Sequence, residues 1–173
     1  MRHHNHMEQK NKRALLIIDV QNGFVTEHSQ HVVPAVEALC QRADYQFVAA
    51  SQHINHPKSA LWNWLSWQKC RREDSHDIAL AFTPPKHVYV YEKDTYSALT
   101  PELCDEFKKR GITHVDICGI DTEACVLATA LALFDQGVFK PHILPHACGS
   151  HACPQTHTHA VKIIETLVGK KAS

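Results

Sequence analysis

Short apolar runs alternate with amphipathic stretches along this chain. The apolar runs are rich in branched side chains and predict buried β-strands at residues 14–18, 46–51, 87–91, 114–118 and 138–144. Between them, apolar residues recur every three or four positions and predict helices at residues 32–43, 100–110, 122–136 and 154–168. The helix at 122–136 is apolar nearly all round, so we expect it to be buried. Strands that alternate with helices predict a three-layer α/β domain, with a mostly parallel sheet of five or six strands and helices on both faces.

One domain accounts for most of the chain. Residues 1–13 are a polar tail rich in histidine, and residues 14–173 are predicted to form a single domain. Residues 52–85 follow no clear period, and they are expected to cover the site or to form an interface. This segment contains three tryptophans, Trp62, Trp64 and Trp67. If they are exposed they form a large apolar patch, and we therefore expect a homo-oligomer, either a dimer or a tetramer.

The composition narrows the class of ligand. Apolar residues make up 44% of the chain, and 18 basic residues balance 18 acidic ones. Without a basic field the chain is not expected to bind nucleic acid, and its longest apolar runs are too short to cross a membrane. The seven cysteines are odd in number and never spaced as C-x-x-C, which favours reduced thiols. No secretory signal is visible. We expect a cytoplasmic protein that acts on a small molecule.

Three reactive side chains stand at predicted strand ends. In open parallel sheets, ligands bind at the carboxyl ends of the strands. Asp19 directly follows the first apolar run, Lys93 follows the third, and Cys125 falls in the first turn of the helix after the fourth. A helix N-terminus favours a thiolate and binds oxyanions, and a buried carboxylate needs a cation. Each residue alone is also an ordinary turn, surface or core residue, but together they supply a nucleophile, a base and a cation for acyl transfer.

Three blocks around these residues resemble the signature blocks of the isochorismatase-like cysteine hydrolases, a family that includes nicotinamidases. The blocks occur in the family's order, and the resemblance extends over residues 14–168. They lie at residues 15–24, 92–98 and 118–126. The resemblance implies a Rossmann-like fold, a catalytic triad of Asp19, Lys93 and Cys125, and a non-proline cis peptide bond between Ile120 and Asp121. It also implies that the backbone amides of Asp121 and Cys125 form the oxyanion hole.

The same resemblance implies amide hydrolysis through a Cys125 thioester, with Asp19 carrying the proton to the leaving amine. Two alternatives stay open. One is a family member with other hydrolytic chemistry, on a vinyl ether or a ureido group, and the other is a non-catalytic binding protein that keeps the fold. For the substrate pocket we expect a set of residues near the strand ends, namely Gln21, Phe24, His53 and Tyr96.

Nicotinamidases bind a metal through an Asp-x-His pair after the second strand, and this chain departs from that pattern. Here His53 replaces the aspartate and Asn55 replaces the histidine. We therefore expect no metal cofactor, and nicotinamide becomes the weaker substrate hypothesis. Zinc held by His53, His56 and His76 is the alternative. A second group of histidines and cysteines, at residues 146–159, matches no standard zinc spacing and is expected to be a loop that leads into the last helix.

Overall fold

Five parallel strands form one sheet in the order β3-β2-β1-β4-β5. The computed structural model describes residues 11–171, so His3, His4 and His6 of the predicted tail lie outside the described residues. The strands are β1 (Arg13–Ile18), β2 (Phe47–His53), β3 (Tyr89–Lys93), β4 (His114–Ile120) and β5 (Lys140–Gly149). The predicted α/β fold with a parallel sheet is confirmed.

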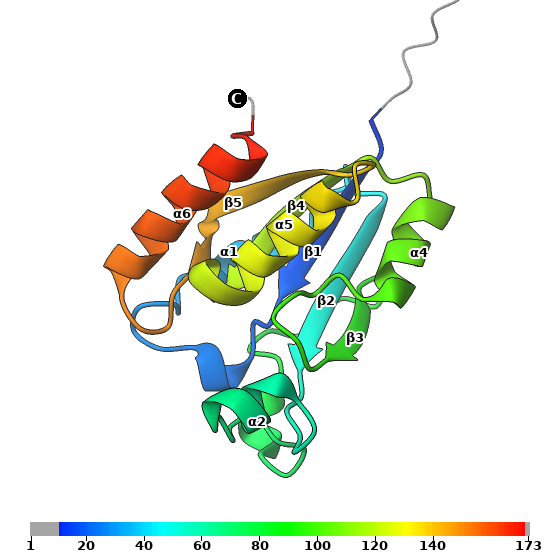
Figure 1. Ribbon diagram of the computed structural model, residues 1–173. Coiled ribbons are helices and arrows are strands. Elements are labelled where there is room, and N and C mark those ends of the chain that lie inside the picture. Colours follow the sequence, from blue (N-terminus) through cyan, green and yellow to red (C-terminus); the bar gives the residue numbers. More distant parts are fainter. Residues whose placement is uncertain (1–10, 172–173) are drawn as a thin grey trace, which may run out of the picture.

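Helices cover both faces of this sheet. Figure 1 shows α1 behind the sheet, with α5 in front of it and α6 beside α5. The helices are α1 (Val32–Cys40), α2 (Ala60–Leu65), α3 (Ser75–Ile78), α4 (Pro101–Lys109), α5 (Leu127–Asp135) and α6 (Pro154–Val168). A short 3-10 helix, η1 (Asn22–Phe24), follows β1, and a π-helical turn, η2 (Thr122–Val126), joins β4 to α5. The predicted helix at 122–136 is thus two segments of different pitch.

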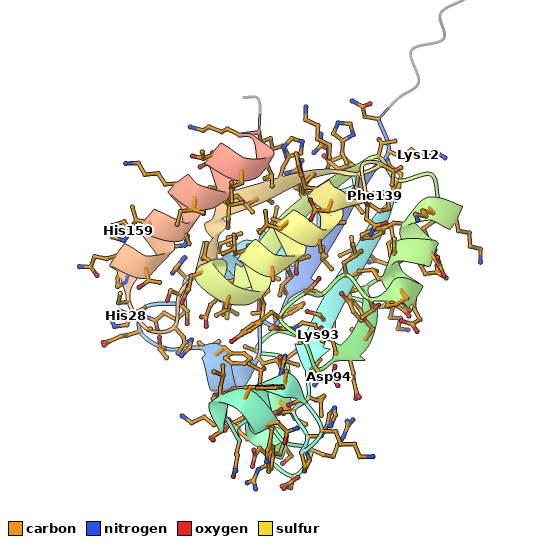
Figure 2. All side chains as sticks on the ribbon, in the orientation of Figure 1. Lys12, His28, Lys93, Asp94, Phe139 and His159 are labelled. Atoms are coloured by element: carbon orange, nitrogen blue, oxygen red, sulfur yellow. The ribbon has the colours of Figure 1, made fainter. Side chains whose placement is uncertain are left out.

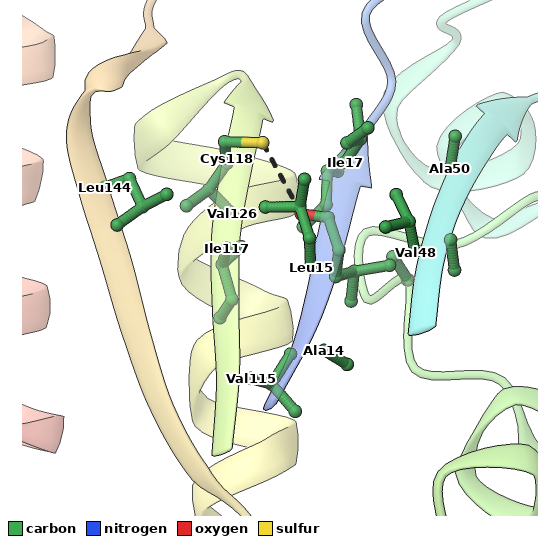
Figure 3. Packing of buried hydrophobic residues seen from close by; sticks show 14 of the residues in the cluster. Ala14, Leu15, Ile17, Val48, Ala50, Val115, Ile117, Cys118, Val126 and Leu144 are labelled. Carbon is green, nitrogen blue, oxygen red and sulfur yellow. Dashed lines mark hydrogen bonds between the residues drawn. The ribbon is translucent and has the colours of Figure 1, made fainter. Parts of the chain in front are cut away.

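The central strand anchors the core. Residues 14–18 of β1 are fully buried between β2 and β4, as the continuous apolar run predicts. Figure 3 shows these side chains packed against those of β2, β4 and the following helix. The two central strands approach so closely that a Cβ atom on Gly119 would lie 2.1 Å from the carbonyl oxygen of Ile18. Only glycine fits there, so Gly119 permits the close pairing of β4 with the end of β1.

Boundaries differ most at the edge strands. The run at 87–91 is β3, which begins and ends two residues later than predicted, because Tyr89 and Val90 on this edge strand are each 41% exposed and the burial pattern is weak. The run at 138–144 is β5, which starts at Lys140 and continues to Gly149. The irregular segment 52–85 contains α2 and α3, and the side chain of Ser59 caps α2 by accepting a hydrogen bond from the backbone N–H of Trp62.

One burial expectation is wrong, and the condition for an exposed tryptophan patch is met by one of the three residues. The helix at 122–136 is not buried throughout, because Phe134 at its end is 49% exposed. The three tryptophans form no common exposed patch: Trp64 is 84% exposed, whereas Trp62 and Trp67 are half-buried. Trp67 is covered because its ring packs against the rings of Phe24 and His53.

No helix within residues 11–171 is both long and apolar enough to cross a membrane. All seven cysteines lie in the described part of the chain, and there each is a free thiol.

Candidate active site

Four neighbouring strands bring polar side chains to one end of the sheet. Asp19 follows β1, His53 ends β2, Lys93 ends β3, and Cys125 lies in η2 directly after β4. The strand order reverses between β1 and β4, which is where open α/β sheets bind their ligands. Figure 2 shows Lys93 and Asp94 at this end of the molecule, with Lys12 and Phe139 at the opposite end.

Asp19 and Lys93 form a buried ion pair. The Nζ atom of Lys93 lies 2.8 Å from Oδ2 of Asp19, and the two side chains are 1% and 0% exposed. Ser51 on β2 donates a hydrogen bond of 2.7 Å to the other carboxylate oxygen of Asp19. Burial alone would lower the pKa of Lys93, but its interactions with the carboxylate of Asp19 and next with Cys125 outweigh burial and raise that pKa. Lys93 is therefore an ammonium at neutral pH.

The backbone at Asp19 supports this geometry. Asp19 has a φ of 51°, in the left-handed region that a residue other than glycine rarely adopts. Such a conformation costs on the order of 1 kcal/mol and persists where the surrounding structure imposes it. The backbone N–H of Asp19 is held by the carbonyl oxygen of Ser51 at 3.2 Å. The left-handed turn is the local conformation in which the carboxylate reaches Lys93.

The ammonium of Lys93 has more acceptors than protons. Besides Asp19, its Nζ atom lies 2.6 Å from the carbonyl oxygen of Thr95, 3.2 Å from Nδ1 of His53 and 3.6 Å from Sγ of Cys125. Three N–H groups serve these four neighbours. Burial and the charge of Lys93 lower the pKa of His53 to about 4, so its imidazole is neutral at physiological pH. Its Nδ1 is then the acceptor toward the ammonium, and the proton resides on Nε2.

Cys125 is a thiol in the resting site. Burial, and next the carboxylate of Asp19, raise the pKa of Cys125 well above that of an ordinary cysteine, although Lys93 acts in the opposite direction. The thiolate expected at a helix N-terminus is therefore not the resting form. One oxygen of Asp19 lies within 4.8 Å of the sulfur. Nucleophilic attack by Cys125 thus requires a base, and Asp19 is the carboxylate within reach.

The turn before Cys125 is tied to the loop after β5. The peptide bond between Ile120 and Asp121 is cis, the isomer that the family resemblance implies. The Asp121 carboxylate accepts a hydrogen bond of 2.8 Å from the backbone N–H of His151 and lies 2.6 Å from Nδ1 of the same residue. Burial is the main cause that raises the pKa of Asp121. The side chain of Asp121 therefore anchors this loop beside the site.

Gln21 does not line a substrate pocket. It is fully buried, and its side-chain amide is occupied by the protein: Oε1 accepts from the backbone N–H of His53 at 2.7 Å, and Nε2 donates to the carbonyl oxygens of His53 and Ile78. The amide thus continues the pairing between β1 and β2 beyond the end of β1. The pocket expectation for Gln21 is wrong because these bonds leave no donor for a substrate, and Gln21 instead holds His53 in place.

The other expected pocket residues lie on two sides of the site. Phe24 is half-buried, and its ring stacks on Trp67 with centroids 6.3 Å apart. His53 contacts the same indole edge to face at 5.6 Å. Tyr96 is 46% exposed and lines a groove of about 500 Å³ next to Thr95, whose carbonyl oxygen binds Lys93. Aromatic rings therefore flank the charged centre, while Cys125 does not line that groove.

Within residues 11–171, the histidines considered for zinc from the sequence form no common group. His56 lies 2.5 Å from Asp94, and the side chain of His76 is 85% exposed on α3. In the cluster at 146–159 the members have separate partners: His151 holds Asp121, and His157 bonds Thr122. Figure 2 shows His159 on α6, well away from Lys93.

One group of three metal-ligating side chains converges within residues 11–171. Asp19, His53 and Cys125 each place a ligand atom within 4.8 Å of the other two. These are a carboxylate oxygen, an imidazole nitrogen and a sulfur, which are the donor types that zinc takes. The group coincides with the charged centre itself.

Sequence reasoning missed several side chains that shape this centre. Ser51 and Thr95 bind Asp19 and Lys93 through short hydrogen bonds, and Trp67 covers His53. Ser51 carries a usable signal, because it is a polar residue at the end of an apolar run that pairs with β1. The contact of Thr95 is made by its backbone, and its side chain carries no signal.

The chain is similar in sequence and in fold to known proteins. Residues 13–172 match the family model described as Isochorismatase domain. A 63-residue stretch, 36% of this chain, is 38% identical to the isochorismatase domain-containing protein 2 of Xenopus laevis, and the match spans only 30% of that relative. The crystal structure of the pyrazinamidase/nicotinamidase of Streptococcus mutans UA159 is similar with a TM-score of 0.80 at 18% identity, covering 92% of this chain and 99% of the other. The N-carbamoylsarcosine amidase of Thermoplasma acidophilum gives a TM-score of 0.72 at 22% identity, covering 88% and 92%.

Proposed function

The chain belongs to the isochorismatase domain family, and on that premise we propose that it is a cysteine hydrolase that cleaves a C–N bond of a small amide. The observation that carries the proposal is the convergence of Asp19, Lys93 and Cys125, which lie far apart in the sequence, around one buried ammonium. A thiol, a carboxylate and a fixed positive charge are the parts that acyl transfer to sulfur requires.

The proposed mechanism uses Cys125 as the nucleophile and Asp19 as the group that takes and returns the proton. Asp19 takes the proton of the Cys125 thiol as the sulfur attacks the substrate carbonyl carbon, and the C=O electron pair moves to oxygen. The backbone amides of Asp121 and Cys125 hold the resulting oxyanion at the N-terminal end of the helix. Asp19 then passes the proton to the leaving nitrogen, the C–N bond breaks, and a thioester remains on Cys125. A water molecule, deprotonated by Asp19, cleaves the thioester and regenerates the thiol.

Lys93 keeps its proton throughout this cycle. Its ammonium stabilises the negative charge that is on Asp19 at the start and on sulfur during attack. We propose that this fixed cation makes a metal cofactor unnecessary for the reaction. Support comes from its position, because Nζ contacts both Asp19 and Cys125 directly.

The substrate class is argued from the walls of the site. Phe24 and Trp67 offer aromatic surface beside the charged centre, and Tyr96 lines the neighbouring groove. We propose that a small planar carboxamide enters past these rings. A ureido compound is the second candidate, favoured by the structural similarity to an N-carbamoylsarcosine amidase. Nicotinamide is the weaker candidate, because His53 and Asn55 stand where nicotinamidases have the aspartate and histidine that bind their metal.

We also propose that the protein is a homo-oligomer. Trp64 is 84% exposed and Leu65, its neighbour on α2, is 63% exposed, so together they present apolar surface that a second copy would cover. Light scattering at micromolar concentration should report a dimer or a tetramer. The Trp64→Ser variant should dissociate toward monomer, and a wild-type monomer would contradict this proposal.

Ammonia release tests the activity. Wild-type protein is incubated with a panel of small primary amides and ureido compounds, beside Cys125→Ala and the matched variant Cys153→Ala, whose cysteine lies on the loop before α6. Wild type and Cys153→Ala should release ammonia from at least one class, and Cys125→Ala should release none above background. Turnover that persists in Cys125→Ala would refute the mechanism, and no turnover of any compound would favour the non-catalytic alternative.

A further inference from the structure

We propose that Asp19, His53 and Cys125 form a latent zinc site that the Lys93 ammonium fills in the resting protein, and that Zn²⁺ inhibits the enzyme by displacing this ammonium and capturing the sulfur. The site differs from the histidine sets considered from the sequence, since neither His56 nor His76 takes part. Zinc is here an inhibitor of the site and plays no role in turnover.

The donor set is the first argument. A carboxylate oxygen, an imidazole nitrogen and a thiol sulfur lie within 4.8 Å of one another, and all three side chains lie at or just after the ends of adjacent strands of one sheet. Ligand atoms around a tetrahedral zinc ion sit roughly 3.3 to 3.8 Å apart, given zinc–ligand bonds of about 2.0 to 2.3 Å. A contraction of about 1 Å therefore suffices to bring the three atoms to bonding distance.

Lys93 is the second argument, because its charge sits where a metal would sit. Its Nζ atom is 2.8 Å from Asp19, 3.2 Å from His53 and 3.6 Å from Cys125, so one cation already contacts all three donors. An ammonium satisfies these atoms by hydrogen bonds, and a zinc ion would satisfy them by shorter coordinate bonds. The two cations exclude each other, and removal of one opens the position for the other.

His53 distinguishes this site from an ordinary reactive thiol. It is 2% exposed, and the Gln21 amide holds its backbone on both sides. An ammonium can only donate, so the Nδ1 atom 3.2 Å from Nζ of Lys93 is the acceptor and presents its lone pair to the cation. A fixed imidazole nitrogen that presents its lone pair to a cation is placed to bind a metal ion.

The exchange balances in protons and charge. Zn²⁺ takes Cys125 as the thiolate, so the thiol proton leaves to solvent. The Lys93 ammonium keeps its charge and moves toward the carbonyl oxygen of Thr95, which it already contacts at 2.6 Å. Because a proton is released, zinc should bind more tightly as the pH rises.

Protection of the sulfur tests the proposal without any turnover. Wild-type protein is treated with iodoacetamide at buffered zinc concentrations and cleaved before aspartate, which releases residues 121–134 with Cys125 as the one cysteine, and alkylation of this peptide is followed by mass spectrometry. Zinc should protect this peptide, and a chelator should reverse the effect. The His53→Leu variant should need at least roughly tenfold more zinc for the same protection. Loss of a residue that merely hydrogen-bonds a zinc ligand already lowers metal affinity by that factor. His76→Gln, which removes an exposed histidine on α3, should behave as wild type.

Removal of the competing ammonium gives a second, independent arm. Lys93→Ala should bind zinc more tightly than wild type, gain thermal stability when zinc is added, and show a thiolate-to-metal charge-transfer band with Co²⁺. That band should vanish in Lys93→Ala/Cys125→Ala. Equal zinc protection in wild type and a folded His53→Leu would overturn the proposal, and so would a Lys93→Ala protein that binds no metal. The second arm decides if His53→Leu fails to fold. An enzyme without amidase activity would leave both arms valid, so this proposal and the proposed function fail separately.

Discussion

Two fully buried aspartates lie in or directly after adjacent strands of the same sheet, and their surroundings differ. Asp116 lies inside β4, toward the end opposite the site. Its carboxylate accepts hydrogen bonds from the side chains of Arg13 at 2.7 Å, Tyr45 at 2.8 Å and Lys171 at 2.7 Å. Asp19 follows β1; Ser51 donates to its Oδ1 atom, and within residues 11–171 its Oδ2 atom has the Lys93 ammonium as its ion-pair partner and no other hydrogen-bond partner. The Asp116 carboxylate thus has three donors, and the Asp19 carboxylate has fewer and keeps capacity for a proton.

The difference separates a structural charge from a reactive one. The cations around Asp116 reach solvent, since the side chains of Arg13 and Lys171 are 23% and 31% exposed. The cation beside Asp19 does not, since Lys93 is 1% exposed. Three donors stabilise the ionised form of the Asp116 carboxylate, whereas the Asp19 carboxylate has an oxygen free to take a proton from the neighbouring thiol. Burial alone does not identify a catalytic group.

The largest expected effect is on turnover. Asp19→Asn should lower kcat/KM by roughly 10²- to 10⁴-fold, because the amide cannot take the thiol proton. Asp116→Asn should leave turnover per folded molecule unchanged. Steady-state kinetics on the amide identified by ammonia release measures both. If the two variants lose activity equally, Asp19 has no special role and the comparison fails.

Removing one charge of the Asp19–Lys93 ion pair should destabilise the protein more than removing both. Lys93→Met strands the buried carboxylate of Asp19 and should lower the free energy of unfolding by about 3 to 5 kcal/mol. The double variant Asp19→Asn/Lys93→Met removes both charges and should recover most of that loss while remaining inactive. Urea denaturation of wild type, both single variants and the double variant completes the cycle. A double variant as unstable as Lys93→Met would show that the pair acts through packing.

At the other aspartate the loss of stability should be smaller. Asp116→Asn removes charge-assisted hydrogen bonds and should lower the free energy of unfolding by about 2 to 3 kcal/mol, since its cationic partners can turn to water. Urea denaturation at unchanged slope measures this value. The comparison would be reversed if Asp116→Asn cost more stability than Lys93→Met.

The smallest effect is on the pH dependence of stability. Burial lowers the pKa of His142 from 6.5 to about 4, and its buried Nδ1 atom has no hydrogen-bond partner among residues 11–171. The unfolded chain therefore binds this proton first, and stability should fall as pH decreases from 6.5 to 4, by on the order of 1 kcal/mol from His142. His53 acts in the same direction, since its pKa is also about 4. His142→Gln should flatten the profile between pH 4 and 6.5, and an unchanged slope would contradict the assignment.

Sequence reasoning located the charged centre because a simple rule applies there. Asp19, Lys93 and Cys125 each follow an apolar run, and parallel strands bring their carboxyl ends to one edge. The prediction of their proximity needed only the strand order of a doubly wound sheet. The strand boundaries mattered less, since β3 lies two residues from its predicted place and still ends at Lys93.

Other contacts could not be read from the residues. The pairing of Gln21 with His53 depends on β2 running two residues beyond its predicted end at residue 51. The covering of His53 by Trp67 depends on how an irregular segment returns to the sheet. The resting thiol depends on how deeply Cys125 is buried and how near Asp19 lies, and the helix N-terminus alone suggested the opposite. Such features arise from tertiary geometry, which local patterns do not encode.

The central claim is that Cys125 carries the acyl group. The most direct measurement is mass spectrometry of the wild-type enzyme quenched in acid during turnover of the amide that it hydrolyses. The peptide that contains Cys125 should gain the mass of the substrate acyl group, and the gain should disappear after brief treatment with hydroxylamine. Rapid turnover with that peptide unmodified, or with the adduct on another residue, would contradict the account.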